Sequence, residues 1–386
     1  MSISAFPPAR ANRRSSAGLR RLVIQEHLTG YLFILPAVAL ISLFGIFPIA
    51  YAFYMSLYRW RVRQGSFLGL ANYERALGDW WGALFFVGGF LLLALAYGTW
   101  TSSRRVVIAR LGGAVLAFLG ATAIARGWGM MTAAGDRQFL NSLIITLYYA
   151  LGTVPAELIL SLILAYVLFQ NIRGRDLFRM VYFLPYITPV VATAVVFRTI
   201  FSPRETSLAN QALALLGLEP QKWLFEPRPF LQVMFGWEGS GLLAGPSMAL
   251  VSIIAFGIWT YVGYNTVIFL AGLGAIPREL YEAAQIDGAS RIGLFRYITL
   301  PLLSPVTFYL TLIAFIGTFK AFNHIWVMQV PSAQNTVEVA SVAIFNTFYK
   351  ANQFGYAAAQ AILLFLIILG LTLAQNKVLG ERVFYG

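Results

Sequence analysis

Long apolar stretches recur along the whole chain and are separated by shorter polar segments. Each stretch is near the length of about 20 residues that a helix needs to cross the hydrocarbon core of a bilayer. The stretches lie at 30–57, 82–99, 106–124, 139–169, 177–201, 248–275, 300–322 and 355–375. This pattern predicts an all-α fold, a polytopic membrane helical bundle with about eight transmembrane helices.

Composition agrees with this class of fold and excludes several kinds of chemistry. Hydrophobic residues make up 59% of the chain and charged residues 11%, with a mean hydropathy of +0.72, which is far from a soluble protein. There is no cysteine, and His27 and His324 are far apart, so no metal site is expected. The sequence contains no GxxxxGK[ST] loop, so we do not expect this chain to hydrolyse ATP by itself.

The distribution of basic residues predicts the orientation of the spans. The net charge is +13, and five arginines precede the first span: Arg10, Arg13, Arg14, Arg20 and Arg21. By the positive-inside rule they predict a cytoplasmic N-terminus, and eight spans then place the C-terminus inside as well. Further basic residues fall in the cytoplasmic segments: Arg104, Arg105, Arg173, Arg175, Arg278, Arg291, Arg296, Lys377 and Arg382. Four arginines on the predicted outer side oppose the rule without reversing it: Arg59, Arg61, Arg63 and Arg75.

The connection at 202–247 is too polar to span a membrane and contains five prolines. We expect an ordered external loop with a short helix near 208–216, lying on the membrane surface or on a partner. A loop of this length is uncommon unless it has a function.

A polar segment between two spans, YEAAQIDGASRIGLFRYITLPLLSPV at 281–306, carries the most specific pattern in the chain. Glu282, Ala283 and Ala284 predict a short helix with small side chains, which a partner surface can approach closely. Gly288 suits a positive φ that ends this helix, and Pro301 suits the first turn of the next one. The alternative is an ordinary polar loop.

In its order of residues this segment resembles the cytoplasmic coupling loop, or EAA motif, of bacterial ABC-importer permeases. The matching positions are Glu282, Ala283, Ala284, Asp287, Gly288 and Pro301, within a loop at 278–300. Four further segments resemble carbohydrate-importer permeases, namely GLANYERALGD, QFLNSLIITLYY, FRMVYFLPYITPVVATAVVFRTIF and IWTYVGYNTVIFLAGLGAIPRELYEAA. Together with the ending KVLGERVFYG, they are most similar to the maltose-type first permease subunit.

This resemblance implies a division of the chain into four parts. They are a cytoplasmic basic N-terminus at 1–29, a first span and external loop at 30–79, an inserted two-helix hairpin at 80–137, and a permease core at 138–386. The core and first span make a six-helix permease, to which the hairpin adds two spans. Two other departures from the family pattern, Asn323 for an aspartate and MQVPSAQNT at 328–336 for a glycine-rich turn, leave the sugar unidentified.

A sugar site inside a membrane needs aromatic rings and neutral hydrogen-bonding groups that face a cavity. By resemblance, Tyr264 is the best single candidate for substrate contact. The other candidates are Tyr261, Asn265, Thr318, Lys320 and Asn323. The alternative is that the tyrosines form an interfacial aromatic belt and that Asn265 packs between helices.

Glu157 is the one acidic residue that the pattern places well inside a span. A carboxylate there suggests function, such as proton coupling. No histidine or lysine lies near it in the sequence to form a relay, so we expect a structural role, facing the bundle or a partner subunit.

The sequence therefore predicts the transmembrane permease subunit of an ATP-driven sugar importer in a bacterial inner membrane. The resemblance implies four partners: a second permease subunit, a dimer of ATP-binding subunits that hold ATP and Mg²⁺, a periplasmic or lipid-anchored solute-binding protein, and the sugar itself. No nucleic acid is expected. As a transport subunit, the chain is not expected to be an enzyme. The rival classes are an ion-coupled secondary transporter, which predicts inverted repeats and charge pairs within the membrane, and an integral-membrane enzyme, which needs convergent catalytic residues.

Overall fold

The computed structural model describes residues 16–102, 106–170, 173–239, 241–380 and 383. Several basic residues used above to predict the orientation, namely Arg10, Arg13, Arg14, Arg104, Arg105 and Arg382, lie outside these ranges. The chain divides into two compact units, Met1–Tyr54 and Met55–Gly386.

The first unit is a long apolar helical segment. It consists of α1 (Ser16–Ile41), a π-helical turn (Ser42–Ile46) and α2 (Phe47–Ser56), whose last residues begin the second unit. The segment Ile24–Ser56 is long and apolar enough to cross a membrane, as the sequence predicts. Pro36 lies inside α1 and removes one backbone donor from it.

The second unit contains most of the predicted spans. Its long helices are α4 (Trp80–Ser102), α5 (Val106–Ala134), α6 (Arg137–Phe169), α11 (Met248–Ala275), α15 (Ser304–Phe319) and α19 (Phe354–Gly380). Within the described ranges, the whole chain has 6 helices that meet the criteria for a span, or up to 8 when two bent helix pairs are each taken as one. The predicted helical membrane bundle is confirmed.

Two spans that the sequence pattern presents as continuous are bent. α7 (Arg175–Ile187) and α8 (Val190–Ile200) meet at 96°, and the segment Arg291–Leu302 meets α15 at 61°. At the first bend Thr188 has φ −69° and ψ 140°, an extended conformation that the following Pro189 favours. Apolar periodicity alone does not show this break.

The second unit also contains a small β-hairpin, which the all-α prediction omits. β1 (Tyr58–Trp60) pairs antiparallel with β2 (Gln64–Phe67), and α3 (Ala71–Leu77) follows. Asn72 on α3 donates to the backbone oxygens of Ser56 (2.7 Å) and Tyr58 (3.1 Å). The Ser56 and Tyr73 hydroxyls lie 2.6 Å apart. The hairpin is therefore anchored to α3 by buried polar contacts.

Glycines allow the backbones of α4 and α5 to approach each other closely. They recur every seven residues, at Gly82 and Gly89 on α4 and at Gly113, Gly120 and Gly127 on α5. A Cβ on Gly127 would lie 2.6 Å from the Gly82 oxygen, and a Cβ on Gly89 would lie 2.7 Å from the Gly120 oxygen. A seven-residue repeat keeps these positions on one seam of each helix. Backbone contact along this seam holds the two helices together.

The two ends of this helical hairpin meet. Gly78 has φ +80°, and a Cβ there would lie 2.4 Å from the nitrogen of Gly135. The next residue, Asp136, donates its N–H to the Arg75 oxygen at 3.1 Å. Its carboxylate accepts the N–H groups of the first turn of α6 and the Tyr356 hydroxyl at 2.7 Å. The hairpin thus leaves and rejoins the rest of the unit at one point.

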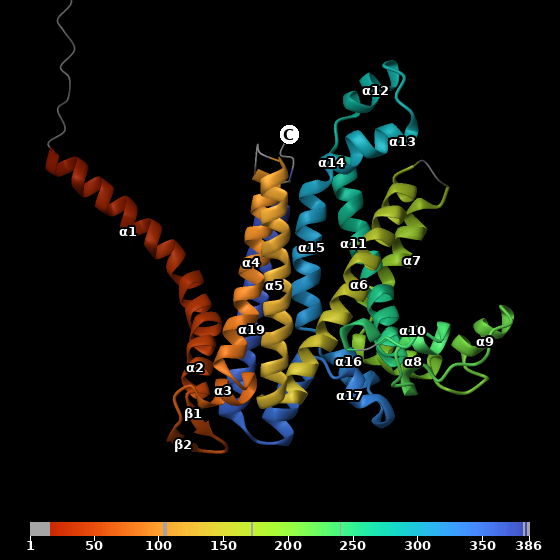
Figure 1. Cartoon of the computed structure of the whole chain (residues 1–386). Helices are drawn as coiled ribbons and strands as arrows, with labels where there is room; N and C mark the ends of the chain where they lie inside the picture. Colours follow the sequence, from red (N-terminus) through yellow and green to blue (C-terminus); the bar gives the residue numbers. More distant parts are fainter. Residues whose placement is uncertain (1–15, 103–105, 171–172, 240, 381–382, 384–386) are drawn as a thin grey trace, which may run out of the picture. The chain divides into compact units, whose positions relative to one another are not determined.

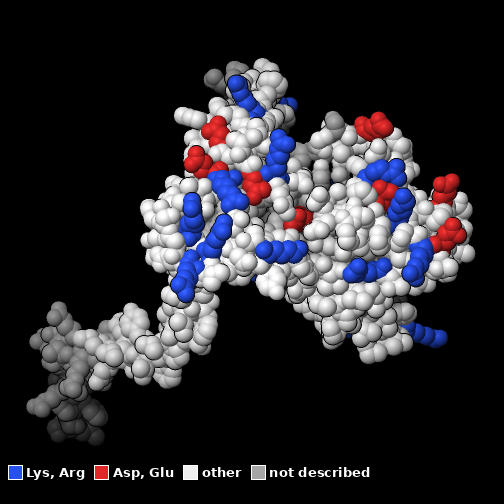
Figure 2. Space-filling view, turned by 90° about the horizontal axis from the view of Figure 1, so that it is seen from below, with Lys and Arg blue, Asp and Glu red and all other residues white. Residues whose placement is uncertain are grey.

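The remaining elements close the two ends of the second unit. At one end are α12 (Arg278–Ile286), α13 (Arg291–Leu294), a π-helical turn (Phe295–Thr299) and α14 (Leu300–Leu302). At the other end are β1, β2, α3, α16 (Asn323–Met328), a 3-10 turn (Pro331–Ala333), α17 (Gln334–Val337), α18 (Ala340–Phe345) and a π-helical turn (Asn346–Lys350) (Figure 1). Figure 2 looks onto this second end, where Lys and Arg side chains are spread over the surface with Asp and Glu among them.

The connection at 202–247 is ordered and contains the short helix predicted near 208–216. It consists of α9 (Leu208–Leu215), a 3-10 turn (Trp223–Phe225), α10 (Phe230–Phe235) and a second 3-10 turn (Gly241–Ala244). The Asn210 side chain bonds to the backbone of Arg204 and Gln221 and to the indole N–H of Trp223. One buried amide thus fixes α9 against the loop.

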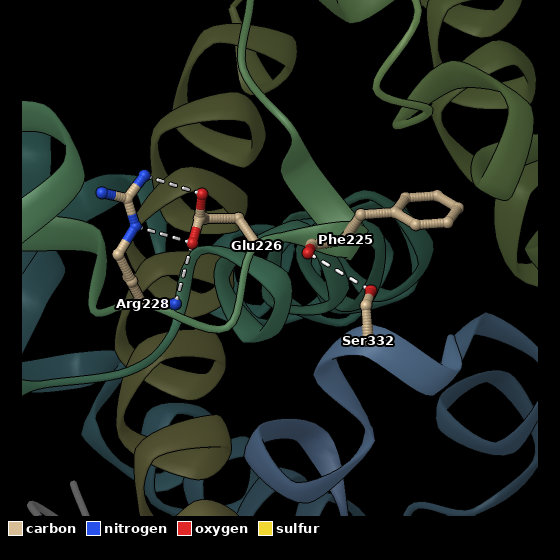
Figure 3. A network of polar contacts seen from close by, with 4 residues as sticks. All are labelled: Phe225, Glu226, Arg228 and Ser332. Atoms are coloured by element: carbon tan, nitrogen blue, oxygen red, sulfur yellow. Dashed lines mark hydrogen bonds and ion pairs between the residues drawn. The ribbon is translucent and has the colours of Figure 1, made fainter.

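An ion pair between the buried Glu226 and the exposed Arg228 fixes the second half of this connection (Figure 3). Arg228 donates from Nε and Nη2 to the two carboxyl oxygens of Glu226, each at 2.9 Å, and its backbone N–H donates to Oε1 at 3.1 Å. The hydrogen bonds from Arg228 hold the pKa of Glu226 below its usual value. Nearby, Ser332 donates to the Phe225 oxygen at 3.3 Å and joins the loop to the 3-10 turn at Pro331–Ala333.

The meeting of the hairpin's ends predicts that the hairpin is removable. Deleting 80–134 joins Asp79 to Gly135 and keeps Asp136, so the remaining helices should fold and the protein should stay monodisperse in detergent. Deleting 80–137 also removes the cap of α6, which typically stabilises by about 1 kcal/mol. We expect a lower melting temperature for this second variant. Aggregation of both variants would show that the hairpin is needed for folding.

The Glu226 pair predicts acid sensitivity of the loop. The pKa of Glu226 is lower in the folded loop than in the unfolded one. The ionised carboxylate therefore stabilises the folded loop fully above the ordinary carboxyl pKa, and this stabilisation is lost as pH falls through the folded pKa. Pepsin cleavage within 202–247 should therefore accelerate as the pH falls below about 4. Glu226→Gln should be cleaved faster at higher pH and show a smaller acid-dependent increase. Equal pH profiles would contradict this role.

Candidate functional site

The predicted coupling segment forms a helical projection at one end of the second unit (Figure 1). Glu282, Ala283 and Asp287 are exposed on or just after α12. Tyr281 packs inward, and its hydroxyl lies 2.9 Å from the hydroxyl of Thr299, which is buried. The projection therefore has an exposed side available to a partner and an inner side fixed to the bundle.

The turn after α12 has the geometry that the sequence predicts. Gly288 has φ +80°, and a Cβ there would meet no atom within 4 Å. The N–H of Ala289 bonds back to the Ala284 oxygen at 2.9 Å, which closes the last turn of the helix. Ser290 then caps α13, and Pro301 lies in the first turn of α14.

Large apolar side chains project from this segment. Ile286 is 87% exposed, Ile292 79% and Tyr297 75%. Tyr281 and Leu302 pack on a buried cluster formed mainly by α6, α11 and α15. The inner side of this segment therefore packs against the ends of the long helices.

A cavity of about 230 Å³ lies where the broken span α7–α8 faces α11 and the junction of α15 with α16. Polar and aromatic side chains dominate its lining. The lining residues are Tyr186, Thr188, Val190, Thr260, Tyr261, Gly317, Lys320, Ala321, Phe322, Asn323 and His324.

The structure brings some, but not all, of the predicted substrate residues to this cavity. Tyr261, Lys320 and Asn323 line it, whereas Tyr264 does not. Thr318 is buried and donates its hydroxyl to the Phe315 oxygen at 3.0 Å. Asn265 is also buried, away from the lining. Neither residue is among the lining residues, and their contact with a substrate stays a prediction.

Tyr264 contacts a residue that lines the cavity, Tyr186. Its side chain stacks on Tyr186 with a centroid distance of 4.5 Å and an interplanar angle of 23°. Tyr186 also contacts Tyr261, with centroids 6.1 Å apart. Sequence reasoning did not select Tyr186, although Pro185 and Pro189 on either side mark a broken helix of the kind that often lines a site.

His324 was also missed as a site residue. It is buried, and its Nε2 lies 2.8 Å from the Tyr149 hydroxyl. Gly257 makes room for this pair, because a Cβ there would lie 2.7 Å from the same hydroxyl. A lone histidine after a span gives no sequence signal for such a contact.

Glu157 faces the interior of the bundle, in agreement with the structural role expected for it. It is 3% exposed, and its polar neighbours include Asn265 and Tyr261 on α11. Its Oε2 and the Nδ2 of Asn265 have no hydrogen-bond partner among the described residues. No described residue forms an ion pair with it, and so the charge pair of an ion-coupled carrier is not found here.

One glycine sets the position of the broken span against α11. A Cβ on Gly263 would lie 1.6 Å from the Tyr182 oxygen and 3.1 Å from the Cα of Phe183. No alanine fits at this position unless α7 moves. The contact fixes the distance between the tyrosines of α7 and those of α11.

Long helices around a polar cavity, with an exposed helical projection at one end, are typical of a membrane permease. The family described as "Binding-protein-dependent transport system inner membrane component" matches residues 157–383. This is more than half of the chain, and the chain belongs to that family. It is a transmembrane permease subunit of an ABC importer.

Curated relatives match nearly the whole chain. The arabinooligosaccharides transport system permease protein AraP of Bacillus subtilis is 28% identical over 367 residues, which cover 95% of this chain and 93% of AraP. The trehalose/maltose transport system permease protein MalF of Thermococcus litoralis is 26% identical, with 93% of this chain and 96% of MalF covered. The lactose transport system permease protein LacF of Rhizobium radiobacter is 28% identical, with 92% and 95% covered.

Solved structures share the fold. A chain of a bacterial ABC transporter involved in the import of the acidic polysaccharide alginate superposes with a TM-score of 0.62 and 20% identity, covering 94% of this chain and 98% of its own. A second alginate transporter structure, in complex with alginate pentasaccharide-bound periplasmic protein, gives a TM-score of 0.55 and 21% identity, covering 79% and 92%. At these identities the likeness establishes the fold alone.

The close contact at Gly263 predicts a selective effect of one methyl group. Gly263→Ala should force α7 away from α11 and lower both the yield of folded protein and its melting temperature. Gly274→Ala is the matched control on the same helix, because a Cβ there meets nothing within 4 Å. It should be neutral or slightly stabilising, since alanine favours a helix by about 1 kcal/mol over glycine. Equal thermal stability of the two variants would show that α7 yields without cost.

Proposed function

We propose that this permease subunit forms half of the translocation pathway of a bacterial importer for sugars, as sequence analysis predicts. The observation that carries the proposal is the near full-length similarity to permeases named for arabinooligosaccharides, trehalose and maltose, and lactose. The cavity supports it, because tyrosine rings with hydroxyl and amide groups suit a sugar. The rival classes, a secondary transporter and a membrane enzyme, do not account for this family.

The partners follow from this role. A second permease subunit completes the pathway, and a solute-binding protein delivers the sugar from outside. A dimer of ATP-binding subunits holds ATP and Mg²⁺, since this chain has no phosphate-binding loop. In this arrangement the chain's own role is transport and coupling, and catalysis belongs to the ATP-binding subunits.

The projection at α12 is where we place the coupling to the ATP-binding subunits. Its exposed carboxylates and apolar side chains, among them Glu282 and Ile286, suit a partner groove. Movement of that groove during ATP hydrolysis displaces α12 and, through Tyr281 and Thr299, the ends of the spans. The end with α12 is then cytoplasmic, as are both termini. The end with the 202–247 loop lies on the outer side of the inner membrane and faces the solute-binding protein.

The turn at Gly288 predicts loss of coupling without loss of folding. Gly288→Pro imposes a negative φ where +80° is required, and so it should reduce sugar-stimulated ATP hydrolysis of the assembled complex by tenfold or more, as should Glu282→Lys. Gly288→Asn is the matched control, because asparagine tolerates a positive φ. It should retain most activity. If Gly288→Pro and Glu282→Lys both support normal uptake, the segment does not couple.

We expect substitution of Tyr264 to impair transport without impairing assembly of the complex. Tyr264→Ala removes the ring that supports Tyr186, so sugar uptake should fall, by about fivefold for a loss near 1 kcal/mol. Tyr264→Phe keeps the stacked ring and should transport normally. Assembly with the ATP-binding subunits and basal ATP hydrolysis should be unchanged in both. Unaltered uptake by Tyr264→Ala would assign this ring to packing.

A further inference from the structure

The charges that line the cavity are unbalanced. Lys320, at the end of α15, is the single Lys or Arg residue among the described lining residues, and none of those residues is Asp or Glu. No described residue forms an ion pair with Lys320. The buried carboxyl of Glu157 is not among the lining residues.

The rest of the lining can donate hydrogen bonds to an anion. Thr260, Tyr186, Tyr261 and Asn323 supply hydroxyl and amide groups. The N-terminal end of α8, which begins at Val190, also reaches the cavity and has no side-chain cap. A helix N-terminus carries a partial positive charge, so it adds to the effect of Lys320.

The C-terminal end of α7, at the bend between α7 and α8, partly offsets the positive potential of Lys320 and the α8 N-terminus. α7 ends beside the cavity, where its last carbonyl groups carry partial negative charge. Thr188 donates both its hydroxyl and its backbone N–H to the Leu184 oxygen, at 2.8 and 3.2 Å. One of these carbonyls is therefore already paired, and the full charge of Lys320 exceeds the half charge that remains.

From this arrangement we propose that the transported sugar carries an anionic group, such as a uronate carboxylate or a sulfate, that pairs with Lys320. The inference rests on the proposed function and specifies its substrate class. An ammonium with surrounding neutral donors is a chemical match for a carboxylate or a sulfate.

The test uses the complete importer, with its solute-binding protein, in proteoliposomes. The binding protein is loaded from a digest that contains neutral, uronate and sulfated oligosaccharides, and the sugar that accumulates inside the vesicles is identified by mass spectrometry. We expect an acidic sugar, and its mass distinguishes a carboxylate from a sulfate. Accumulation of neutral sugars alone would overturn the inference while leaving sugar import intact. ATP hydrolysis without accumulation of any sugar would instead contradict the proposed function.

Variants then test the residue itself. Lys320→Gln should lower uptake of the acidic sugar by about tenfold, the effect of losing one hydrogen bond to a charged group. Lys320→Arg keeps the charge and should retain uptake. Lys350→Gln is the matched control, because Lys350 lies over the Trp326 ring and away from the cavity lining. Equal uptake of the acidic sugar by wild type and Lys320→Gln would overturn the assignment.

Discussion

Close approach of helix backbones is the constraint on which the second unit depends. Lipid gives no hydrophobic drive for apolar helices to associate, so packing contacts and hydrogen bonds between them must do so. At Gly263 the backbones of α7 and α11 meet with no room for a methyl group, and Gly257 admits the Tyr149 hydroxyl between α6 and α11. These contacts place the tyrosines of α7 and α11 beside one another. The cavity is therefore a consequence of where glycine occurs on α11.

The coupling segment and the cavity belong to the same helices. α11 carries Tyr261, which lines the cavity, and Tyr264, which stacks on the lining residue Tyr186. The chain then continues through Pro277 into α12. α15 begins just after α14 and ends next to Lys320. Each helix joins one end of the unit to the cavity. In the proposed function, movement at α12 would therefore reach the cavity along these two helices as well as through the contact of Tyr281 with Thr299.

The sequence predicts those features that depend on local chemistry. Apolar length gives the spans, and Gly288 and Pro301 give the shape of the coupling segment, because both act through their own backbone. The bend at Thr188 and the contacts of Tyr186 and His324 depend on which helices meet, and periodicity does not contain that information. For the same reason, the sequence does not show that Tyr261 lines the cavity while Asn265, one turn further along α11, does not.

The meeting of Gly78 with Gly135 has a consequence for how such a chain can change in evolution. When the two ends of a segment touch, the length of that segment does not affect the positions of the other helices. Helical pairs can then be gained, lost or exchanged between these two glycines in one genetic step, without reorienting any other span. The same point is a natural acceptor for a fused domain, which would be displayed beside the permease while the path through its cavity is unchanged.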